Sequence, residues 1–272
     1  MTHPDIKPTN AVSVFGVPFD AYSSFLKGPA KAPLVFFDSL SNGSANSSTE
    51  LGVDLKKHPH IEFIESITWP EDDQAFAVIE NTVSQIVEGG RKPLVIGGDH
   101  SITYPVLKGV AAKHDNVTIL HFDAHPDLYD EFKGNRYSHA CPFARIMESN
   151  LASRLVQVGI RTLNAHQREQ AQRFNVEVHE MRHWQGPEQL DIKEPVYISI
   201  DIDALDPAFA PGVSHLEPGG MSVRQILDVI HSLDVPIIGA DIVELNPTRD
   251  INNMTAMVAI KLYKELCGKM LG

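Results

Sequence analysis

Short apolar runs alternate with longer amphipathic segments along most of the chain. The short runs are rich in Val, Ile and Leu, which predicts buried β-strands. These strands are expected at Val12–Val17, Pro93–Ile96, Val117–Phe122, Leu155–Ile160, Val196–Ile202 and Val235–Val243. The longer segments place their apolar residues on one face of a helix. These helices are expected at Asp73–Val87, Tyr104–Lys113, Ala165–Phe174, Val223–Leu233 and Met254–Met270.

This alternation predicts the fold class. Strands that are apolar on both faces, with helices between them, are typical of an α/β protein whose mainly parallel sheet is covered by helices on both sides. Ligands of such sheets bind beyond the carboxyl ends of the strands. The polar segments Ser41–Thr49 and Trp184–Glu194 are too short to be interdomain linkers. We therefore expect one domain over residues 1–272.

Composition and charge narrow the choice of partners. The chain has 272 residues, 43% of them hydrophobic, and a formal net charge of −12 from 35 acidic and 23 basic residues. This charge disfavours nucleic acid and suits a cationic substrate. Cys141 and Cys267 form neither a disulfide framework nor a zinc motif, and Cys141 is interpreted as a packed residue. Met1–Asn10 lacks an apolar signal core, and no apolar run is long enough to cross a membrane, so we expect a soluble, cytoplasmic protein with no membrane partner.

Three polar motifs, each directly after a predicted strand, carry side chains that bind divalent metals. In two of them these side chains stand two residues apart, so an extended chain turns them to the same face. The carboxyl ends of parallel strands share one edge of a sheet, so the three motifs are expected to meet there. Together they offer four carboxylates and two imidazoles, which suits two divalent cations that share bridging carboxylates. The predicted metal ligands are His100, Asp123, His125, Asp127, Asp201 and Asp203.

Each motif alone has a simpler explanation. Aspartates also cap helices and begin turns, and the glycines before His100 can serve a tight turn. Three separate turns at three strand ends explain the pattern less well than one shared site does. Oxygen-rich ligation with two imidazoles and no thiolate cluster favours Mn²⁺. Two such ions, about 3.5–4 Å apart, lower the pKa of a shared water and hold a hydroxide at neutral pH.

Four polar residues near these motifs have interpretations that the sequence leaves open. His139 lies in the loop after the second motif, and an imidazole with a pKa near ~6.5 is a candidate proton shuttle. Glu244 ends the last apolar strand, where it pairs either with an arginine such as Arg249 or with a bound guanidinium. His121 lies deeper in its strand and is interpreted as a core residue or a support of the site. Asp206 precedes a proline and indicates a turn.

These motifs resemble the signature sequences of the ureohydrolase (arginase/agmatinase) family. The resemblance rests on Gly97-Gly-Asp-His-Ser101, Asp123-Ala-His-Pro-Asp127 and Ser199-Ile-Asp-Ile-Asp-Ala-Leu-Asp-Pro207, and it covers nearly the whole chain. It implies a three-layer α/β/α fold, a dimanganese hydroxide that hydrolyses a guanidino group to urea and an amine, and a homo-oligomer, either a trimer or a hexamer. Runs that are similar to plant-type arginases in particular are Ser23–Pro29, Tyr137–Met147, Ala208–Gly220 and Met254–Ala259.

The resemblance also implies roles for individual residues. It makes Asp123 and Asp201 the carboxylates that bridge two Mn²⁺ ions per subunit. His139 becomes the proton shuttle and a substrate contact, and Glu244 becomes the carboxylate that binds the substrate guanidinium. Asp127 is implied as a catalytic residue in addition to its role as a ligand.

The tail of the substrate is less well determined than its guanidinium. Animal-type arginases hold the substrate α-amino group with an acidic residue after a strand like Gly159-Ile-Arg161, but Gly159–Asn164 contains no acid. Asn135 and Ser138 are predicted substrate contacts, and with Arg136 they are candidates to bind an α-carboxylate. The resemblance to plant-type arginases favours L-arginine, hydrolysed to L-ornithine and urea. The alternative is an agmatinase, which converts agmatine to putrescine and urea.

Two further classes share parts of this pattern. Metal-dependent deacetylases have a similar architecture but use one catalytic metal and typically a tyrosine, so the presence of both bridging aspartates argues against them. A non-catalytic family member that only binds metal would be expected to lack a ligand, His139 or Glu244. All of these residues are present.

Overall fold

The computed structural model describes residues 10–70 and 74–272 and shows a parallel sheet in the order β2-β1-β3-β8-β7-β4-β5-β6. Each neighbouring pair of these eight strands is parallel. The strands are β1 (Ala11–Gly16), β2 (Ile61–Phe63), β3 (Arg91–Ile96), β4 (Val117–Phe122), β5 (Ala152–Ile160), β6 (Glu177–Glu180), β7 (Val196–Asp201) and β8 (Ile237–Val243).

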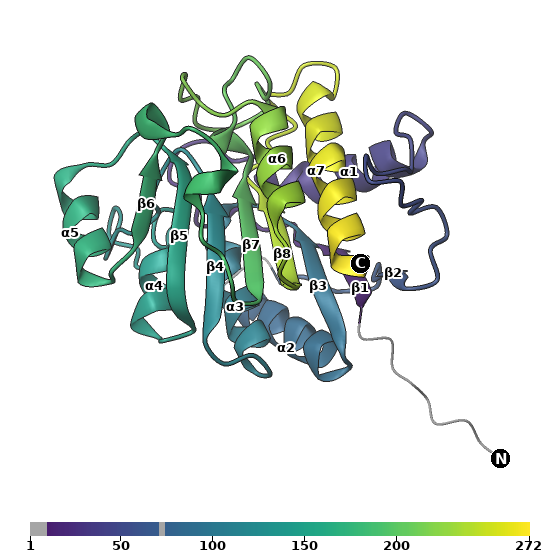
Figure 1. Ribbon diagram of the computed structural model, residues 1–272, viewed down its shortest axis with the longest axis horizontal. Helices are drawn as coiled ribbons and strands as arrows, with labels where there is room; N and C mark the ends of the chain where they lie inside the picture. Colours follow the sequence, from purple (N-terminus) through teal and green to yellow (C-terminus); the bar gives the residue numbers. More distant parts are fainter. Residues whose placement is uncertain (1–9, 71–73) are drawn as a thin grey trace.

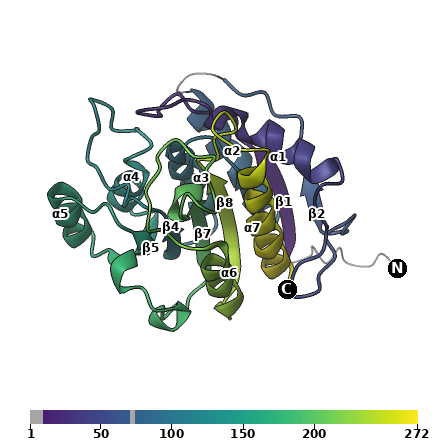
Figure 2. The ribbon, with the colours of Figure 1, turned by 90° about the horizontal axis from the view of Figure 1, so that it is seen from above.

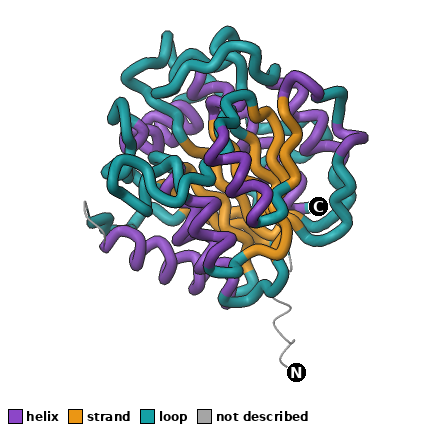
Figure 3. The backbone as a smooth tube through the Cα atoms, turned by 90° about the vertical axis from the view of Figure 1, so that its left-hand side faces the viewer, coloured by secondary structure: helices purple, strands orange, loops and turns teal. Residues whose placement is uncertain are grey.

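Helices cover both faces of this sheet (Figure 1). Seen from above, α2, α3 and α4 lie on one side of the sheet and α6 and α7 on the other, with α1 packed against α7 (Figure 2). The tube view shows the same layers, with the strands between the helices (Figure 3). The predicted α/β fold with a covered parallel sheet is therefore confirmed. The helices are α1 (Ala32–Ser41), α2 (Gln74–Glu88), α3 (Thr103–Ala111), α4 (Pro142–Glu148), α5 (Ala165–Arg173), α6 (Val223–Ser232) and α7 (Met254–Leu271).

The two faces of the sheet build two hydrophobic cores. Leu120 of β4 packs in the core that includes Tyr263 of α7, whereas its neighbour Ile119 packs in the core that includes Val106 of α3. Successive residues of a strand point to opposite faces, and both faces are covered, so every residue of β4, β7 and β8 is buried. Burying an aliphatic side chain of this size stabilises the fold by ~1.5–3 kcal/mol. These paired cores explain the continuous apolar runs in the sequence.

Each predicted strand and helix has a counterpart whose ends differ by a few residues. Helix α6 begins with a capping box. The backbone N–H of Gln225 donates to the Ser222 hydroxyl at 3.2 Å, and the backbone N–H of Ser222 donates to the side-chain oxygen of Gln225 at 2.8 Å. The first residue predicted for α2, Asp73, lies outside the described residues. Residues 10–70 and 74–272 include no helix with the length and hydropathy needed to span a bilayer.

Four elements were not predicted, and their sequences explain why. Strands β2 and β6 are short edge strands whose residues are mostly half-buried or exposed, so they lack a continuous apolar run. Helices α1 and α4 each carry a proline at the first or second position, Pro33 and Pro142. Proline is tolerated there because the first N–H groups of a helix need no intrahelical partner. A proline in the interior of a helix breaks it, so the residue type alone does not predict these two helices.

Candidate dimetal active site

The six predicted metal ligands come together at the carboxyl ends of the four central strands, β3, β8, β7 and β4. His100 follows β3, Glu244 follows β8, Asp201 ends β7, and Asp123 follows β4. In the sheet these strands lie in the order β3, β8, β7, β4, because β7 and β8, which come later in the sequence, are inserted between β3 and β4. Open α/β sheets bind ligands beyond the carboxyl ends of their strands, at places where the strand order changes.

His100 is surrounded by three carboxylates. Its Nδ1 lies 3.2 Å from an oxygen of Asp123, 3.1 Å from Asp127 and 3.3 Å from Asp201. This nitrogen is buried and has no hydrogen-bond partner within the described part of the chain. Its Nε2 lies 3.0 Å from the hydroxyl of Ser199. A buried imidazole nitrogen that faces three carboxylate oxygens without a hydrogen bond fits a metal ligand.

A second group of ligands forms around His125. Its Nδ1 lies 3.1 Å from an oxygen of Asp203 and 3.3 Å from Oδ1 of Asp123. The other oxygen of Asp123, Oδ2, is the one that faces His100. One carboxylate therefore lies between the two imidazoles, as a bridging ligand must. All six predicted metal ligands are in these two groups.

The pKa shifts of the cluster reflect how closely its carboxylates are packed. Burial lowers the pKa of His100 and of His125, but the surrounding carboxylates outweigh it and hold both pKa values well above the usual range. Burial, together with the charges of Asp203 and Asp123, raises the pKa of Asp201 well above its usual value. Both kinds of shift have one cause: carboxylates crowded together in a buried site favour positive charge beside them. Hard oxygen ligands and two imidazoles are a donor set that suits Mn²⁺, so the residues fit the predicted metal.

His139 and Glu244 pair directly, which the sequence did not predict. Nδ1 of His139 lies 2.8 Å from Glu244 Oε1, and the same oxygen accepts the backbone N–H of His100 at 3.0 Å. Burial lowers the pKa of His139, but the adjacent Glu244 carboxylate outweighs it and raises this pKa to about 9. Nε2 of His139 lies 2.8 Å from the Ser24 hydroxyl. Arg249, one of the two partners considered for Glu244, is exposed and is not the partner found.

The backbone around the site has conformations that only a few residue types accept. Asp127 and Glu244 adopt positive φ angles of 49° and 62°, which are uncommon for residues other than glycine and often occur at functional sites. Gly98 allows the loop after β3 to approach the backbone of Phe19, because an added Cβ would lie 1.7 Å from the Phe19 carbonyl oxygen. The glycines before His100 therefore serve close packing, and the site depends on them.

A cavity of about 250 Å³ opens onto the cluster. This volume suits a small metabolite. Asn135 and Ser138, our predicted substrate contacts, are not among its lining residues: the Asn135 side chain accepts the Tyr137 N–H at 2.8 Å, and Ser138 is buried. Arg136 forms ion pairs with Asp130 and Glu148 instead. The lining residues are Ser24, His125, Asp127, Tyr129, Phe132, His139, Ala140, Thr162, Gln167, Asp201, Asp203, His215, Glu217 and Glu244.

Sequence reasoning missed Ser24, His215 and Glu217 as lining residues. His215 lies close to two other imidazoles, with ring centroids 5.8 Å from His125 and 5.7 Å from His139. The backbone of Glu217 is held by Arg161, whose Nε donates to the Glu217 carbonyl at 2.9 Å. All three belong to runs similar to plant-type arginases, and that similarity was the signal that could have identified them.

Two other residues match their sequence interpretation. Asp206 forms a turn in which its carboxylate accepts the N–H groups of Ala208 at 2.9 Å and Gly219 at 2.7 Å. Cys141 is buried, and burial raises the pKa of its thiol to about 12. A neutral, buried thiol is a poor nucleophile, which agrees with a packed residue.

Comparison with known proteins gives consistent matches. A model of the Arginase family matches residues 10–268. Arginase 1, mitochondrial, from Arabidopsis thaliana is 49% identical, over 96% of this chain and 81% of that protein. The structure of an arginase from Medicago truncatula superposes with a TM-score of 0.91 at 44% identity, covering 96% of this chain and 88% of the other. An agmatinase of Bacillus anthracis is 28% identical, over 97% of this chain and 93% of that protein.

The expected cytoplasmic location is wrong. It is contradicted by the names of similar proteins: the Arabidopsis relative is named mitochondrial, and other plant arginases are named mitochondrial or chloroplastic. The expectation rested on the missing apolar core in Met1–Asn10, of which residues 1–9 lie outside the described residues. Organellar transit peptides are amphipathic and rich in arginine and serine, so a search for an apolar segment does not detect them.

The fold, the cluster of metal ligands and the comparisons lead to the same conclusion. The family match covers residues 10–268, and the carboxylates around His100 and His125 lie close enough together to hold a metal ion. This chain belongs to the arginase family, whose members are manganese-dependent ureohydrolases acting on guanidino compounds.

Proposed function

We propose that this protein is an arginase, which hydrolyses L-arginine to L-ornithine and urea. One observation carries the proposal. Glu244, a buried carboxylate hydrogen-bonded to His139, lines the same small cavity as four of the predicted metal ligands. A planar guanidinium is the cation that a carboxylate binds through two parallel hydrogen bonds. The 49% identity to a plant arginase, against 28% to an agmatinase, supports arginine over agmatine.

Two manganese ions per subunit are part of this proposal. His100 and Asp127 would hold one ion, and His125 and Asp203 the other, with Asp123 and Asp201 shared between them. When bound, the ions supply a hydroxide nucleophile at neutral pH. Asp123 turns one carboxylate oxygen toward His100 and the other toward His125, which supports the sharing of this carboxylate by two ions.

The remaining residues bind the substrate and move a proton. Glu244 would orient the guanidinium, because the His100 N–H and His139 already fix the position of its Oε1. His139 holds a proton on Nδ1, because the Glu244 carboxylate only accepts and Nε2 accepts the backbone N–H of Ser24 at 3.1 Å. It would deliver this proton to the amine that leaves as urea forms. Asp127 combines its ligand role with a place on the cavity wall, where it would contact the reacting groups.

The test is urea release from several guanidino compounds. The protein is stripped with a chelator, reloaded with Mn²⁺ and assayed with L-arginine, agmatine and γ-guanidinobutyrate. The highest kcat/KM is expected for L-arginine. A higher kcat/KM for agmatine would replace the proposal with an agmatinase, and no urea from any compound would contradict both.

Two features of the whole protein are part of the same proposal. All eight strands of the described residues belong to one sheet, and the two cores lie on its opposite faces, which supports one catalytic domain. A homo-oligomer is proposed from the family resemblance. Light scattering coupled to size-exclusion chromatography measures it, and a monomeric mass would contradict it.

A further inference from the structure

His121 is a buried histidine that the proposed reaction does not use. It lies in β4, two residues before Asp123, and its side chain is fully buried. Its Nε2 lies 2.9 Å from Oδ2 of Asp123, the oxygen that also faces His100. The ring therefore contacts the carboxylate that both ligand groups share.

The hydrogen bonds around Gln157 determine which nitrogen of His121 carries the proton. The Gln157 amide nitrogen lies 2.6 Å from the carbonyl oxygen of Pro126 and 2.9 Å from Nδ1 of His121. A carbonyl oxygen only accepts, so the NH₂ group of the amide must face it. The second hydrogen of the same NH₂ group then points to Nδ1, which must be the acceptor. The proton of the neutral ring is on Nε2, and Nε2–H donates to Asp123.

The opposite orientation of the Gln157 amide is unfavourable. It would turn the Gln157 oxygen toward the Pro126 carbonyl, placing two acceptors 2.6 Å apart. In the orientation found, Gln157 Oε1 is buried without a hydrogen-bond partner among the described residues. An unsatisfied buried oxygen costs ~1–3 kcal/mol. The fold tolerates this loss of stability at Gln157, whose amide nitrogen fixes the tautomer of His121.

We propose that His121 and Gln157 are positioning residues that fix the carboxylate of Asp123 for metal binding, an inference that rests on the proposed metal site. Both oxygens of Asp123 are then held. Oδ1 accepts the backbone N–H of His125 at 2.5 Å, and Oδ2 accepts Nε2–H of His121 at 2.9 Å. A carboxylate anchored at both oxygens cannot rotate. One rotation of this carboxylate would misplace a ligand of both ions.

The first experiment measures the tautomer. Metal-free protein labelled with ¹⁵N-histidine is studied by long-range ¹H–¹⁵N correlation, and the His121 signals are identified by their loss in His121→Gln. The proton is expected on Nε2 in the wild type. A proton on Nδ1 would overturn the inference, because His121 would then have no hydrogen to donate to Asp123.

The second experiment measures affinity for Mn²⁺ alone, by titration of the metal-free protein. His121→Phe keeps an aromatic ring beside Phe143, whose ring centroid lies 3.9 Å away, but it removes the donor. Changes to groups that support metal ligands cost ~10–100-fold in affinity, and the same loss is expected here. His121→Gln, which returns an N–H within reach of Asp123, is expected to recover most of it. Gln157→Leu is expected to give a smaller loss than His121→Phe.

A matched control separates positioning from packing. Thr118→Val is a nearly isosteric change at another buried position of β4, and its Mn²⁺ affinity is expected to equal that of the wild type. Thermal melting of each metal-free variant checks that it folds. If His121→Phe does not fold, Gln157→Leu and the tautomer measurement still decide the question. Folded variants at His121 and Gln157 with wild-type affinity would overturn the inference.

The outcome does not depend on which guanidino compound the enzyme hydrolyses. The tautomer and the Mn²⁺ affinity are measured without substrate, so a different substrate preference leaves them unchanged. If the wild-type protein binds no Mn²⁺, the proposed function fails before the variants are compared. If it binds Mn²⁺ and the variants bind it equally well, only the positioning role fails.

Discussion

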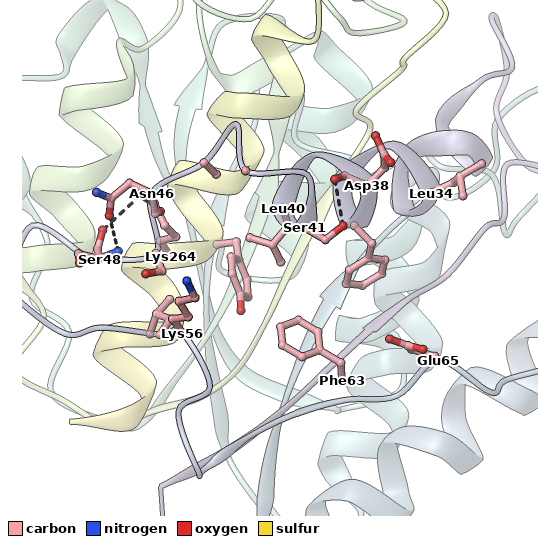
Figure 4. Close-up of a pocket in the computed structure, with 16 residues that line it drawn as sticks. Leu34, Asp38, Leu40, Ser41, Asn46, Ser48, Lys56, Phe63, Glu65 and Lys264 are labelled. Carbon is pink, nitrogen blue, oxygen red and sulfur yellow. Dashed lines mark hydrogen bonds between the residues drawn. The ribbon is translucent and has the colours of Figure 1, made fainter.

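A hollow of about 920 Å³ lies between α1, β2 and α7, whereas the cavity that contains His139 and Glu244 measures about 250 Å³. The large hollow is lined by Leu34, Phe63 and Lys264, among others (Figure 4). It lies away from the carboxyl ends of the central strands, and none of its lining residues is a predicted metal ligand.

The charged groups of the two cavities differ in their environment. In the large hollow, Lys264 donates to backbone carbonyl oxygens at 2.8 and 3.2 Å, and Asp38 and Glu65 are exposed to solvent. In the small cavity, buried carboxylates lie within 3.3 Å of imidazole nitrogens. Burial and neighbouring charge shift the pKa values of these groups, which is typical of functional sites. The convergence of buried ionisable groups, rather than cavity size, marks the active site.

The largest expected effect comes from removing the carboxylate of Asp123, which lies between His100 and His125 beside the small cavity. In Asp123→Asn, a neutral amide cannot hold two cations, so both metal ions and the activity are expected to be lost. Metal content by elemental analysis and urea release together check this. A variant that keeps wild-type activity without bound metal would contradict the dinuclear site.

Replacing His139 is expected to have the next largest effect. His139→Asn removes the proton donor but no proposed ligand, so kcat should fall by ~10²–10⁴-fold while the metal content stays constant. Measuring kcat and bound manganese on the same samples distinguishes the loss of a proton donor from the loss of a metal ligand. If metal content falls in proportion to kcat, His139 is a ligand or a structural residue instead.

A smaller loss is expected for the residue proposed to bind the guanidinium. Glu244→Gln keeps the shape of the side chain and removes its charge, and a charge-assisted hydrogen bond is worth ~1.5–3 kcal/mol, so kcat/KM should fall at least ~10-fold. The loss should be the same for arginine and agmatine, because both share the guanidinium. A loss for only one of them would show that Glu244 contacts the tail of the substrate.

The pair formed by His139 and Glu244 also predicts how stability depends on pH in the metal-free protein. The folded-state pKa of His139 is raised to about 9, above the ~6.5 of an unperturbed histidine. Its stabilising contribution is therefore complete below pH ~6.5 and is lost as the pH rises through 9, by at most ~3 kcal/mol. Chemical denaturation of wild type and His139→Asn at several pH values measures this. Equal pH dependence of the two proteins would contradict the raised pKa.

The smallest effect is expected in the large hollow. Leu34 is exposed to 77% and lines that hollow, so Leu34→Ser should leave kcat/KM unchanged. The free energy of unfolding should change by no more than ~0.5 kcal/mol, as at most surface positions. A large loss of activity in this variant would show that the large hollow also contributes to catalysis.

The sequence by itself determined the sheet and the edge of the sheet at which the predicted metal ligands meet. Apolar runs predict strands that are buried on both faces, because both faces of a parallel sheet are covered. His100, Asp123 and Asp201 follow such runs, and parallel strands bring their carboxyl ends to one edge. A local pattern together with one topological rule was enough to bring these ligands together.

Only the tertiary structure decided the contacts that depend on how distant loops meet. His139 and Glu244 are 105 residues apart, and nothing local in either run indicates that they pair. Likewise, the Asn135 side chain accepts the N–H of Tyr137 instead of lining the cavity, whereas His215 and Glu217, from another loop, line its wall. The crossover connections place these loops, and a side chain in a loop points where the packing of other segments allows. Strand spacing therefore predicts which residues hold the metal, whereas the partners of the substrate depend on the assembled fold.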